Sequence, residues 1–163
     1  MASSKPLSAS LEDYLETIHH IISEKQVARA KEIADRLKVS RPSVTEAFRS
    51  LAQKGLINYA PYEVITLTEQ GRALAEDVIR RHRALKDFFI KVLAVGEAMA
   101  EEGACKIEHA APREIIDRLT KFVDFIEKCP RGGSDLINGF SRYCQSGQID
   151  DKCRECIALC LEK

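Results

Sequence analysis

The chain lacks the features that would assign it to a membrane or secreted class of protein. Among its 163 residues, no stretch approaches the roughly 18 consecutive apolar residues that a membrane-spanning helix needs. The opening residues, Met1 to Pro6, contain no apolar run of the kind found in signal peptides. We therefore expect a cytoplasmic location. In such a reducing compartment, the six cysteines favour metal or redox chemistry over disulfides.

An excess of charge of one sign is also absent. Lys and Arg total 25, as do Asp and Glu, so the formal net charge is zero, which argues against a uniformly basic nucleic-acid-binding protein. The charges are nevertheless segregated. Residues 22–58 hold eight basic and four acidic side chains, a net of +4, whereas residues 97–163 hold ten basic and thirteen acidic, a net of −3. Ordinary solvated surface is one interpretation, but a basic front and an acidic rear indicate two separate functions.

Sequence motifs of common enzyme classes are missing as well. The chain has neither a glycine-rich phosphate-binding loop nor a nucleophile elbow, and it shows no internal repeat. Its hydrophobic content of 45% and charged content of 31% are ordinary for a globular protein, which excludes global disorder. We predict that the chain is not an enzyme, and a metalloenzyme is the weakest of the functional hypotheses below.

Hydrophobic spacing in the first half predicts three helices and a hairpin. Apolar residues at i, i+4, i+7 and i+11 indicate a helix over 11–22, with Ser10 as its N-cap. A short helix over 30–37 follows, and then one that starts near Pro42, is capped by Ser40 and stops at Lys54–Gly55. Two β-type runs, 56–59 and 64–68, flank a proline-containing turn and predict the hairpin.

Only helices are predicted after the hairpin. A long one, capped by Thr68, runs to about Val95, and shorter ones cover 97–109, 112 to about 128, 135–144 and 150–161. The predicted fold class is therefore mainly α, with an N-terminal winged helix-turn-helix followed by an all-helical domain. Two short helices joined by a tight turn and followed by a hairpin are the defining parts of that DNA-binding motif.

The second helix of such a pair enters the major groove through its N-terminal residues. Hydroxyl groups there can bond to phosphates, and Arg41 can reach a phosphate or a guanine. A helical hairpin that only packs a core is the alternative, but the net charge of +4 favours DNA. The predicted DNA-contacting residues lie on this helix, at its end and on the wing: Ser40, Arg41, Pro42, Ser43, Thr45, Glu46, Arg49, Lys54 and Tyr62.

Candidate metal ligands come from three different predicted helices: Asp13, Glu16, His82, Cys105, Glu108 and His109. The last three are spaced i, i+3 and i+4, which places a thiol, a carboxylate and an imidazole on one helix face. Each residue alone has an ordinary explanation, such as a satisfied core histidine, but their combination predicts a metal site. Carboxylates and imidazoles with one soft ligand suit Fe(II) or Mn(II), and Co, Ni and Zn can bind in vitro. A structural zinc site would hold more thiolates.

These motifs resemble the diphtheria toxin repressor and manganese transport regulator family of metal-dependent repressors. The similarity covers about residues 8–133. It is carried by six short segments: Leu11 to Glu16, Ser40 to Thr45, Gly55 to Ile57, Leu67 to Gly71, Arg80 to Arg83 and Ala104 to His109.

The resemblance implies a homodimer, formed through helices in roughly 97–128, whose metal lies between the DNA-binding and dimerisation domains. The family's ligand positions match the six candidates named above. A metal-loaded dimer is expected to bind palindromic operator DNA and to repress metal-uptake genes. The domains are then predicted as 8–75 for DNA binding, 76–133 for the linker helix and metal-binding and dimerisation domain, and 134–163 for a cysteine-rich helical tail.

The chain departs from the family pattern at three positions. Manganese-type members have a carboxylate in place of Cys105, whereas iron-type members share that cysteine but have methionine in place of Asp13. The resemblance therefore implies a hybrid site, for which we favour Fe(II) over Mn(II). Some iron-type members build a second metal site with a glutamate where this chain has Lys86.

Four of the five cysteines from residue 129 onward form a C-x8-C-x2-C-x3-C pattern: Cys144, Cys153, Cys156 and Cys160. Four thiols are enough for zinc or an iron–sulfur cluster. The last three also share one helix face with Ile157 and Leu161, so packing is an equally open interpretation. The second functional hypothesis is therefore an iron–sulfur or redox-sensing DNA-binding regulator that uses these cysteines.

Overall fold

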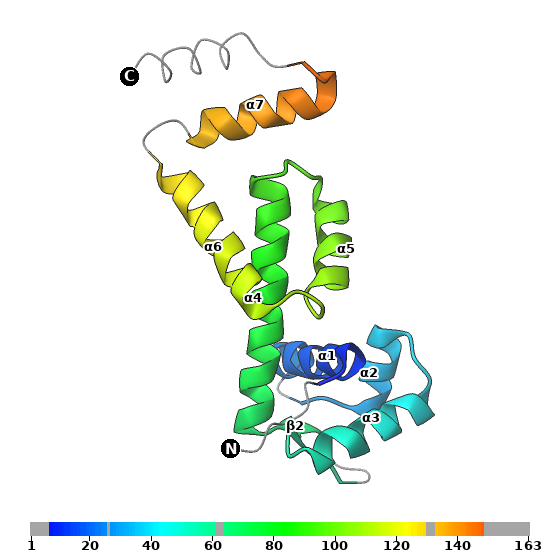
Figure 1. Cartoon of the computed structure of the whole chain (residues 1–163). Helices are drawn as coiled ribbons and strands as arrows, with labels where there is room; N and C mark the ends of the chain where they lie inside the picture. The colour runs from blue at the N-terminus through cyan, green and yellow to red at the C-terminus, as the bar shows by residue number, and fades with distance from the viewer. Residues whose placement is uncertain (1–6, 26, 61–63, 130–132, 149–163) are drawn as a thin grey trace. The chain divides into compact units, whose positions relative to one another are not determined.

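The structure is a computed structural model that describes residues 7–25, 27–60, 64–129 and 133–148 (Figure 1). The chain divides into two compact units after Arg81. Both units are mainly helical, and the first also contains a small two-stranded sheet, which confirms the predicted fold class. Within the described residues, no helix is both long and apolar enough to cross a membrane.

The first unit packs three helices and a hairpin against the N-terminal part of a long helix (Figure 1). One face of the first helix supplies Leu15, Ile18 and Ile21 to the core, where they are completely buried with Phe48. The apolar spacing that predicted this helix is therefore the spacing of its buried face. The elements in chain order are α1 (Ala9–Lys25), α2 (Ala30–Leu37), α3 (Arg41–Gln53), β1 (Ile57–Asn58), β2 (Thr66–Leu67) and α4 (Glu69–Lys91).

The helix-turn-helix formed by α2 and α3 follows the sequence prediction closely. The connection turns at Lys38, whose left-handed backbone, φ 54°, ends α2. Ser40 then caps α3, because its Oγ accepts a hydrogen bond from the Ser43 backbone N–H at 3.3 Å. Pro42 stands in the first turn of α3, where its missing N–H costs no helical bond.

The wing is a short antiparallel hairpin. Ile57 pairs with Leu67 and Asn58 pairs with Thr66. The first pair faces the core and the second faces outward, where Asn58 Nδ2 donates to Thr66 Oγ1 at 2.9 Å. The hairpin prediction is confirmed, although its turn at residues 61–63 lies outside the described part of the chain.

A close approach of two backbones fixes the start of α4. Thr68 Oγ1 accepts a hydrogen bond from the Gly71 N–H at 3.0 Å and donates to the Gly55 carbonyl at 2.7 Å. A Cβ atom on Gly71 would lie 1.8 Å from the carbonyl oxygen of Leu56. Only glycine therefore fits this position of the helix.

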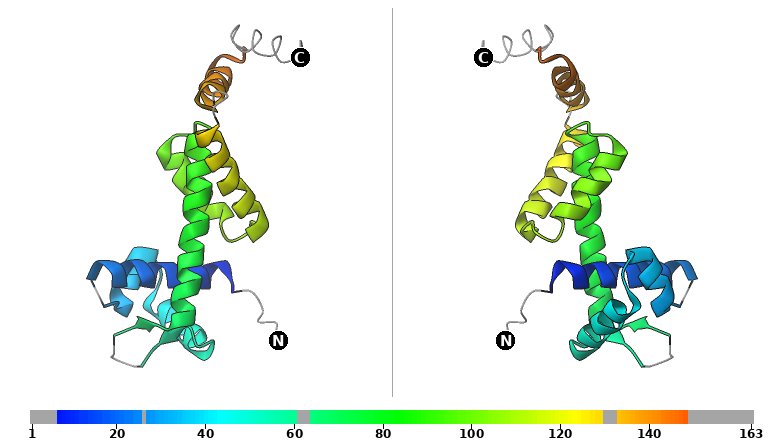
Figure 2. Two further views of the ribbon diagram at one scale, coloured as in Figure 1. Left: turned by 90° about the vertical axis from the view of Figure 1, so that its left-hand side faces the viewer. Right: turned by 90° about the vertical axis from the view of Figure 1, so that its right-hand side faces the viewer.

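The second unit contains the rest of α4 followed by α5 (Glu97–Ile107), α6 (Arg113–Lys128) and α7 (Gly133–Ser146). Both views in Figure 2 show α6 running beside the C-terminal part of α4. The small core between these helices is built from Leu85, Ala104 and Ile116. The predicted helix over 150–161 lies outside the described residues.

Several helix boundaries differ from those predicted, most clearly the end of α4 and the start of α1. Helix α4 ends at Lys91 rather than near Val95, and Ala94 just beyond it has a left-handed backbone, φ 53°. Helix α1 already includes Ser10, because the Ser8 carbonyl accepts hydrogen bonds from the N–H groups of Leu11 and Glu12. The apolar spacing located both helices, but backbone geometry decided where they start and stop.

Candidate metal centre

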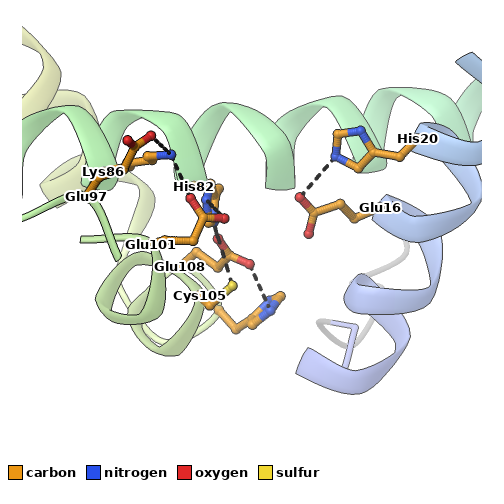
Figure 3. Close-up of polar contacts among 9 residues, drawn as sticks. Glu16, His20, His82, Lys86, Glu97, Glu101, Cys105 and Glu108 are labelled. Atoms are coloured by element: carbon orange, nitrogen blue, oxygen red, sulfur yellow. Dashed lines mark hydrogen bonds and ion pairs between the residues drawn. The ribbon is translucent and has the colours of Figure 1, made fainter. Parts of the chain in front are cut away.

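The second unit brings together three of the predicted ligands. His82 lies on α4, Cys105 lies on α5, and Glu108 is the residue that ends α5. One potential ligand atom from each residue lies within 4.8 Å of the others. The helical hairpin formed by α4 and α5 thus converts a separation of 23 to 26 residues in sequence into a single cluster (Figure 3).

A buried carboxylate lies at the middle of this cluster. The Glu108 side chain is 1% exposed, and its Oε2 lies 2.6 Å from His82 Nδ1. Its Oε1 lies 3.2 Å from Nε2 of His109, the fourth predicted ligand in this unit. A buried carboxylate is costly unless it is paired, and two imidazoles provide the pairing here. The hydrogen bond to Glu108 is the main reason that the pKa of His82 is raised above its ordinary value.

The thiol of Cys105 lies at the exposed side of the same cluster. Its Sγ atom is 4.0 Å from His82 Nδ1. The centre therefore offers carboxylate oxygen, imidazole nitrogen and thiol sulfur within one small volume. Such a mixed donor set fits a divalent transition-metal ion better than a purely oxygen-binding cation such as Ca²⁺.

Sequence reasoning missed one carboxylate that contacts the cluster. Glu101 Oε1 lies 3.2 Å from His82 Nε2, so the imidazole ring is held between two glutamates, Glu101 and Glu108 (Figure 3). Glu101 precedes Cys105 by four residues on α5, which places both on the same helix face. That spacing is the signal in the sequence by which it could have been found.

The remaining two predicted ligands belong to the first unit. Asp13 and Glu16 are half-buried, one helical turn apart on α1. Glu16 Oε1 lies 3.5 Å from Nε2 of His20, the next histidine along the same helix (Figure 3). Asp13 and Glu16 stay predicted ligands.

Most of the predicted DNA-contacting residues are exposed on or next to α3. Only Thr45 is half-buried, and its hydroxyl donates to the Arg41 carbonyl at 3.1 Å. The hydroxyl oxygens of Ser40 and Ser43 lie 2.8 Å apart. Tyr62 lies outside the described residues. The exposed side chains are Ser40, Arg41, Pro42, Ser43, Glu46, Arg49 and Lys54.

Only one of the four cysteines proposed for a second metal or cluster site is described. Cys144 is an exposed free thiol on α7. Cys153, Cys156 and Cys160 lie outside the described residues.

Comparisons with known proteins match two successive parts of the chain to two domains of one family. Residues 6–65 match the family described as "iron dependent repressor, N-terminal DNA binding domain". Residues 68–136 match "iron dependent repressor, metal binding and dimerisation domain". The HTH-type transcriptional regulator MJ0568 of Methanocaldococcus jannaschii, itself uncharacterised, is 39% identical over 119 residues, which cover 72% of this chain and 95% of that protein.

Solved structures of metal-dependent regulators are also similar to this chain. The metal-dependent transcriptional regulator MtsR is 31% identical with a TM-score of 0.65, and the manganese regulator SloR is 30% identical with a TM-score of 0.63. Both matches cover 75% of this chain but only 57% of the other, so the chain spans little more than half the length of these regulators. The hypothetical protein SSo2273 of Sulfolobus solfataricus is 27% identical, has a TM-score of 0.59, and is matched over 77% of this chain and 96% of its own.

The fold and these matches define a class of metal-dependent, DNA-binding transcriptional regulators, which are not enzymes. The chain belongs to the iron-dependent repressor family, the family of the diphtheria toxin repressor that its motifs resemble. It carries that family's DNA-binding domain and its metal-binding and dimerisation domain.

Proposed function

We propose that this chain is a metal-activated repressor of metal-uptake genes, which binds palindromic operator DNA as a homodimer when Fe(II) is bound. The observation that carries the proposal is the cluster of His82, Cys105 and Glu108 around a carboxylate that is 1% exposed. This cluster of mixed donors, with a buried carboxylate at its middle, lies within a domain whose family binds divalent metal.

The metal centre is proposed to use the four clustered residues of the second unit together with Asp13 and Glu16 of the first. A divalent ion there supplies positive charge that offsets the repulsion between the carboxylates of the set. Because the ligands come from both units, metal binding favours one arrangement of the DNA-binding unit. The size of that preference is set by the difference in metal affinity between arrangements.

The preference for Fe(II) over Mn(II) rests on the donor chemistry. Cys105 places a soft sulfur ligand among carboxylates and imidazoles, and Mn(II) gains less from sulfur than Fe(II) does. Co(II), Ni(II) and Zn(II) stand higher in the affinity order for such ligands, so they serve as strong in vitro activators and do not identify the natural metal.

The surface of the second unit supports the homodimer. Large apolar side chains are exposed on α5 and α6, among them Met99, Ile107, Phe122 and Phe125. Exposed large apolar side chains in a domain whose family is described as a dimerisation domain support a subunit interface. A two-fold symmetric dimer presents two copies of α3 to DNA, which accounts for a palindromic operator with one half-site for each copy.

The proposal is tested by selecting duplexes from a randomised DNA library with anaerobic, Fe(II)-loaded protein. The selected duplex is then titrated with protein in the presence of Fe(II), Mn(II), Co(II), Ni(II) or Zn(II). We expect palindromic duplexes, binding only with metal, and half-maximal binding at a lower concentration of Fe(II) than of Mn(II). Equal DNA binding with and without metal would contradict the proposed function, and a lower requirement for Mn(II) would contradict the choice of metal.

A further inference from the structure

A lysine ammonium lies beside the metal cluster, bound by two carboxylates. Lys86 Nζ is 2.8 Å from a carboxylate oxygen of Glu101 and 3.2 Å from one of Glu97. Glu101 in turn contacts His82 Nε2 at 3.2 Å. Figure 3 shows these side chains as a row that leads from α4 across to α5 and back to the histidine. All of them belong to the second unit.

The spacing of the helices explains why the ammonium reaches this place. Lys86 follows His82 by four residues on α4, and Glu97, Glu101 and Cys105 follow one another at the same interval on α5. Residues four apart share a helix face, so two matching rows of polar side chains meet. Glu97 and Glu101 thus meet at one ammonium group, and Glu101 also contacts His82; carboxylates and imidazoles are side chains that commonly bind divalent cations. The positive charge between these two carboxylates is the ammonium group of Lys86 rather than a metal ion.

We propose that Lys86 is a built-in cation of the metal centre, which holds Glu97 and Glu101 in place of a second metal ion, so that the cluster binds one divalent ion per subunit. This inference rests on the proposed function, because it concerns the same metal centre. Lys86 acts as a positioning residue, since it contacts His82 only through Glu101.

The arrangement also decides which nitrogen of His82 is available to a metal. Glu101 accepts a hydrogen bond from the Nε2 side of the ring, and Nδ1 faces Glu108 and Cys105. In this structure Nδ1 is hydrogen-bonded to Glu108 at 2.6 Å, so a metal at Nδ1 would replace that hydrogen bond while Glu101 keeps the Nε2 proton in place. Lys86 holds Glu101 in this position, because its ammonium lies 2.8 Å from the Glu101 carboxylate.

Manganese stoichiometry tests the proposal. The full chain, stripped of metal, is titrated with Mn(II) while free Mn(II) is followed by electron paramagnetic resonance. Mn(II) is a hard cation that binds thiolates poorly, so the cysteines after residue 133 contribute little to the count. We expect one bound ion per subunit for the unmodified chain and for Lys86→Arg, which keeps the positive charge. We expect two ions for Lys86→Glu, which removes the ammonium and adds a carboxylate.

Lys91→Glu is the matched control. Lys91 lies on the same helix and also bridges two carboxylates, Asp87 at 3.4 Å and Glu127 at 2.9 Å, but it does not contact the cluster. The Lys91→Glu variant should therefore bind one Mn(II) ion per subunit, like the unmodified chain. Two ions in the unmodified chain, or one ion in a folded Lys86→Glu variant, would overturn the role of Lys86 and leave the proposed function standing. If Lys86→Glu does not fold, the counts for the unmodified chain and Lys86→Arg decide. Absence of Mn(II) binding together with metal-independent DNA binding would refute the proposed function itself.

Discussion

At the scale of single residues, Glu108 is the side chain on which the proposed metal centre most depends. Its carboxylate is buried and contacts both His82 and His109. Glu108→Ala should weaken metal activation of DNA binding by more than about 100-fold, because even outer partners of metal ligands are worth roughly 10–100-fold. Operator binding titrated with Fe(II) measures the effect. Glu114→Ala, which truncates an exposed glutamate on α6, should leave the response unchanged.

Cys105 should set the choice between metals. Cys105→Ala removes the sulfur donor that the structure places in the cluster and should abolish metal-dependent operator binding. Cys105→Glu replaces the soft donor by a hard one and should shift the preference toward Mn(II). The measurement is the ratio of Fe(II) to Mn(II) concentrations at half-maximal operator binding. An unchanged ratio in the glutamate variant would show that the thiol does not determine the metal.

His19 should make the first unit sensitive to acid. Its side chain is 19% exposed, and its Nδ1 is buried without a hydrogen-bond partner among the described residues. Burial lowers the pKa of His19, and Glu76, 3.8 Å from Nε2, only partly opposes this. The unfolded chain therefore takes up this proton more readily than the folded chain. The contribution of neutral His19 to the free energy of unfolding is complete above about pH 6.5, the pKa of histidine in the unfolded chain. This contribution is lost as the pH falls below that value.

Replacing this imidazole should flatten that pH dependence. In the metal-free protein, His19→Gln should show a smaller fall in Tm between about pH 7.5 and pH 5 than the unmodified chain. His20→Gln, which changes the exposed neighbouring imidazole, is the control and should keep the larger fall. The raised pKa of His82 acts in the opposite direction in all three proteins, so their differences isolate His19. Identical curves for His19→Gln and the unmodified chain would contradict this prediction.

At the scale of elements, the junction between the wing and α4 should tolerate no side chain at residue 71. Gly71→Ala places a Cβ atom against the Leu56 carbonyl, a backbone atom that cannot rotate away. We expect a loss of about 2–3 kcal/mol in unfolding free energy, the upper range for an overpacked core. Chemical denaturation measures it. Gly96→Ala, where nothing lies within 4 Å of the added Cβ, should change stability far less.

The elements were largely predictable because local sequence signals mark where many of them begin and end. Ser40, Pro42 and Gly55 mark both ends of α3, and the structure uses each of them as expected. The end of α4 was not predictable, since Val92 and Val95 continue an apolar pattern past the residue where the backbone leaves the helix. The link from Lys86 to Glu101 was missed for another reason. Charged residues on helices are usually solvated, and only the pairing of α4 with α5 shows that these two meet.

At the scale of the whole molecule, the apolar surface of α6 should control assembly. Phe125 is 62% exposed, on the same side of the helix as Phe122. Phe125→Glu would place a charge in the proposed interface, so we expect a monomer that binds operator DNA weakly. Sedimentation velocity reports the mass. Asp124→Lys, on another side of α6, changes charge without entering this apolar surface and should remain dimeric.

The two units differ in how far sequence predicted them. In the first unit, a cap, a proline and two short β-type runs were sufficient to place α3, the helix predicted to contact DNA. In the second, the spacing of Cys105, Glu108 and His109 predicted a ligand cluster around the end of α5, but nothing in the sequence indicated that Glu108 would be almost completely buried. Burial depends on the packing of α4 against α5, and a helix-terminal glutamate gives no local sign of it.

The paired hydroxyls of Ser40 and Ser43, two of the predicted DNA-contacting residues, have a consequence for the thermodynamics of that predicted contact. One O–H is used within the pair, because the two oxygens lie 2.8 Å apart and only one proton can lie between them. A single hydroxyl proton then remains to be donated to a phosphate. Both side chains are already ordered before DNA arrives, so little rotational entropy is lost on contact. The two serines therefore behave as one preorganised hydrogen-bond donor, and the gain from their contact with DNA should be mainly enthalpic.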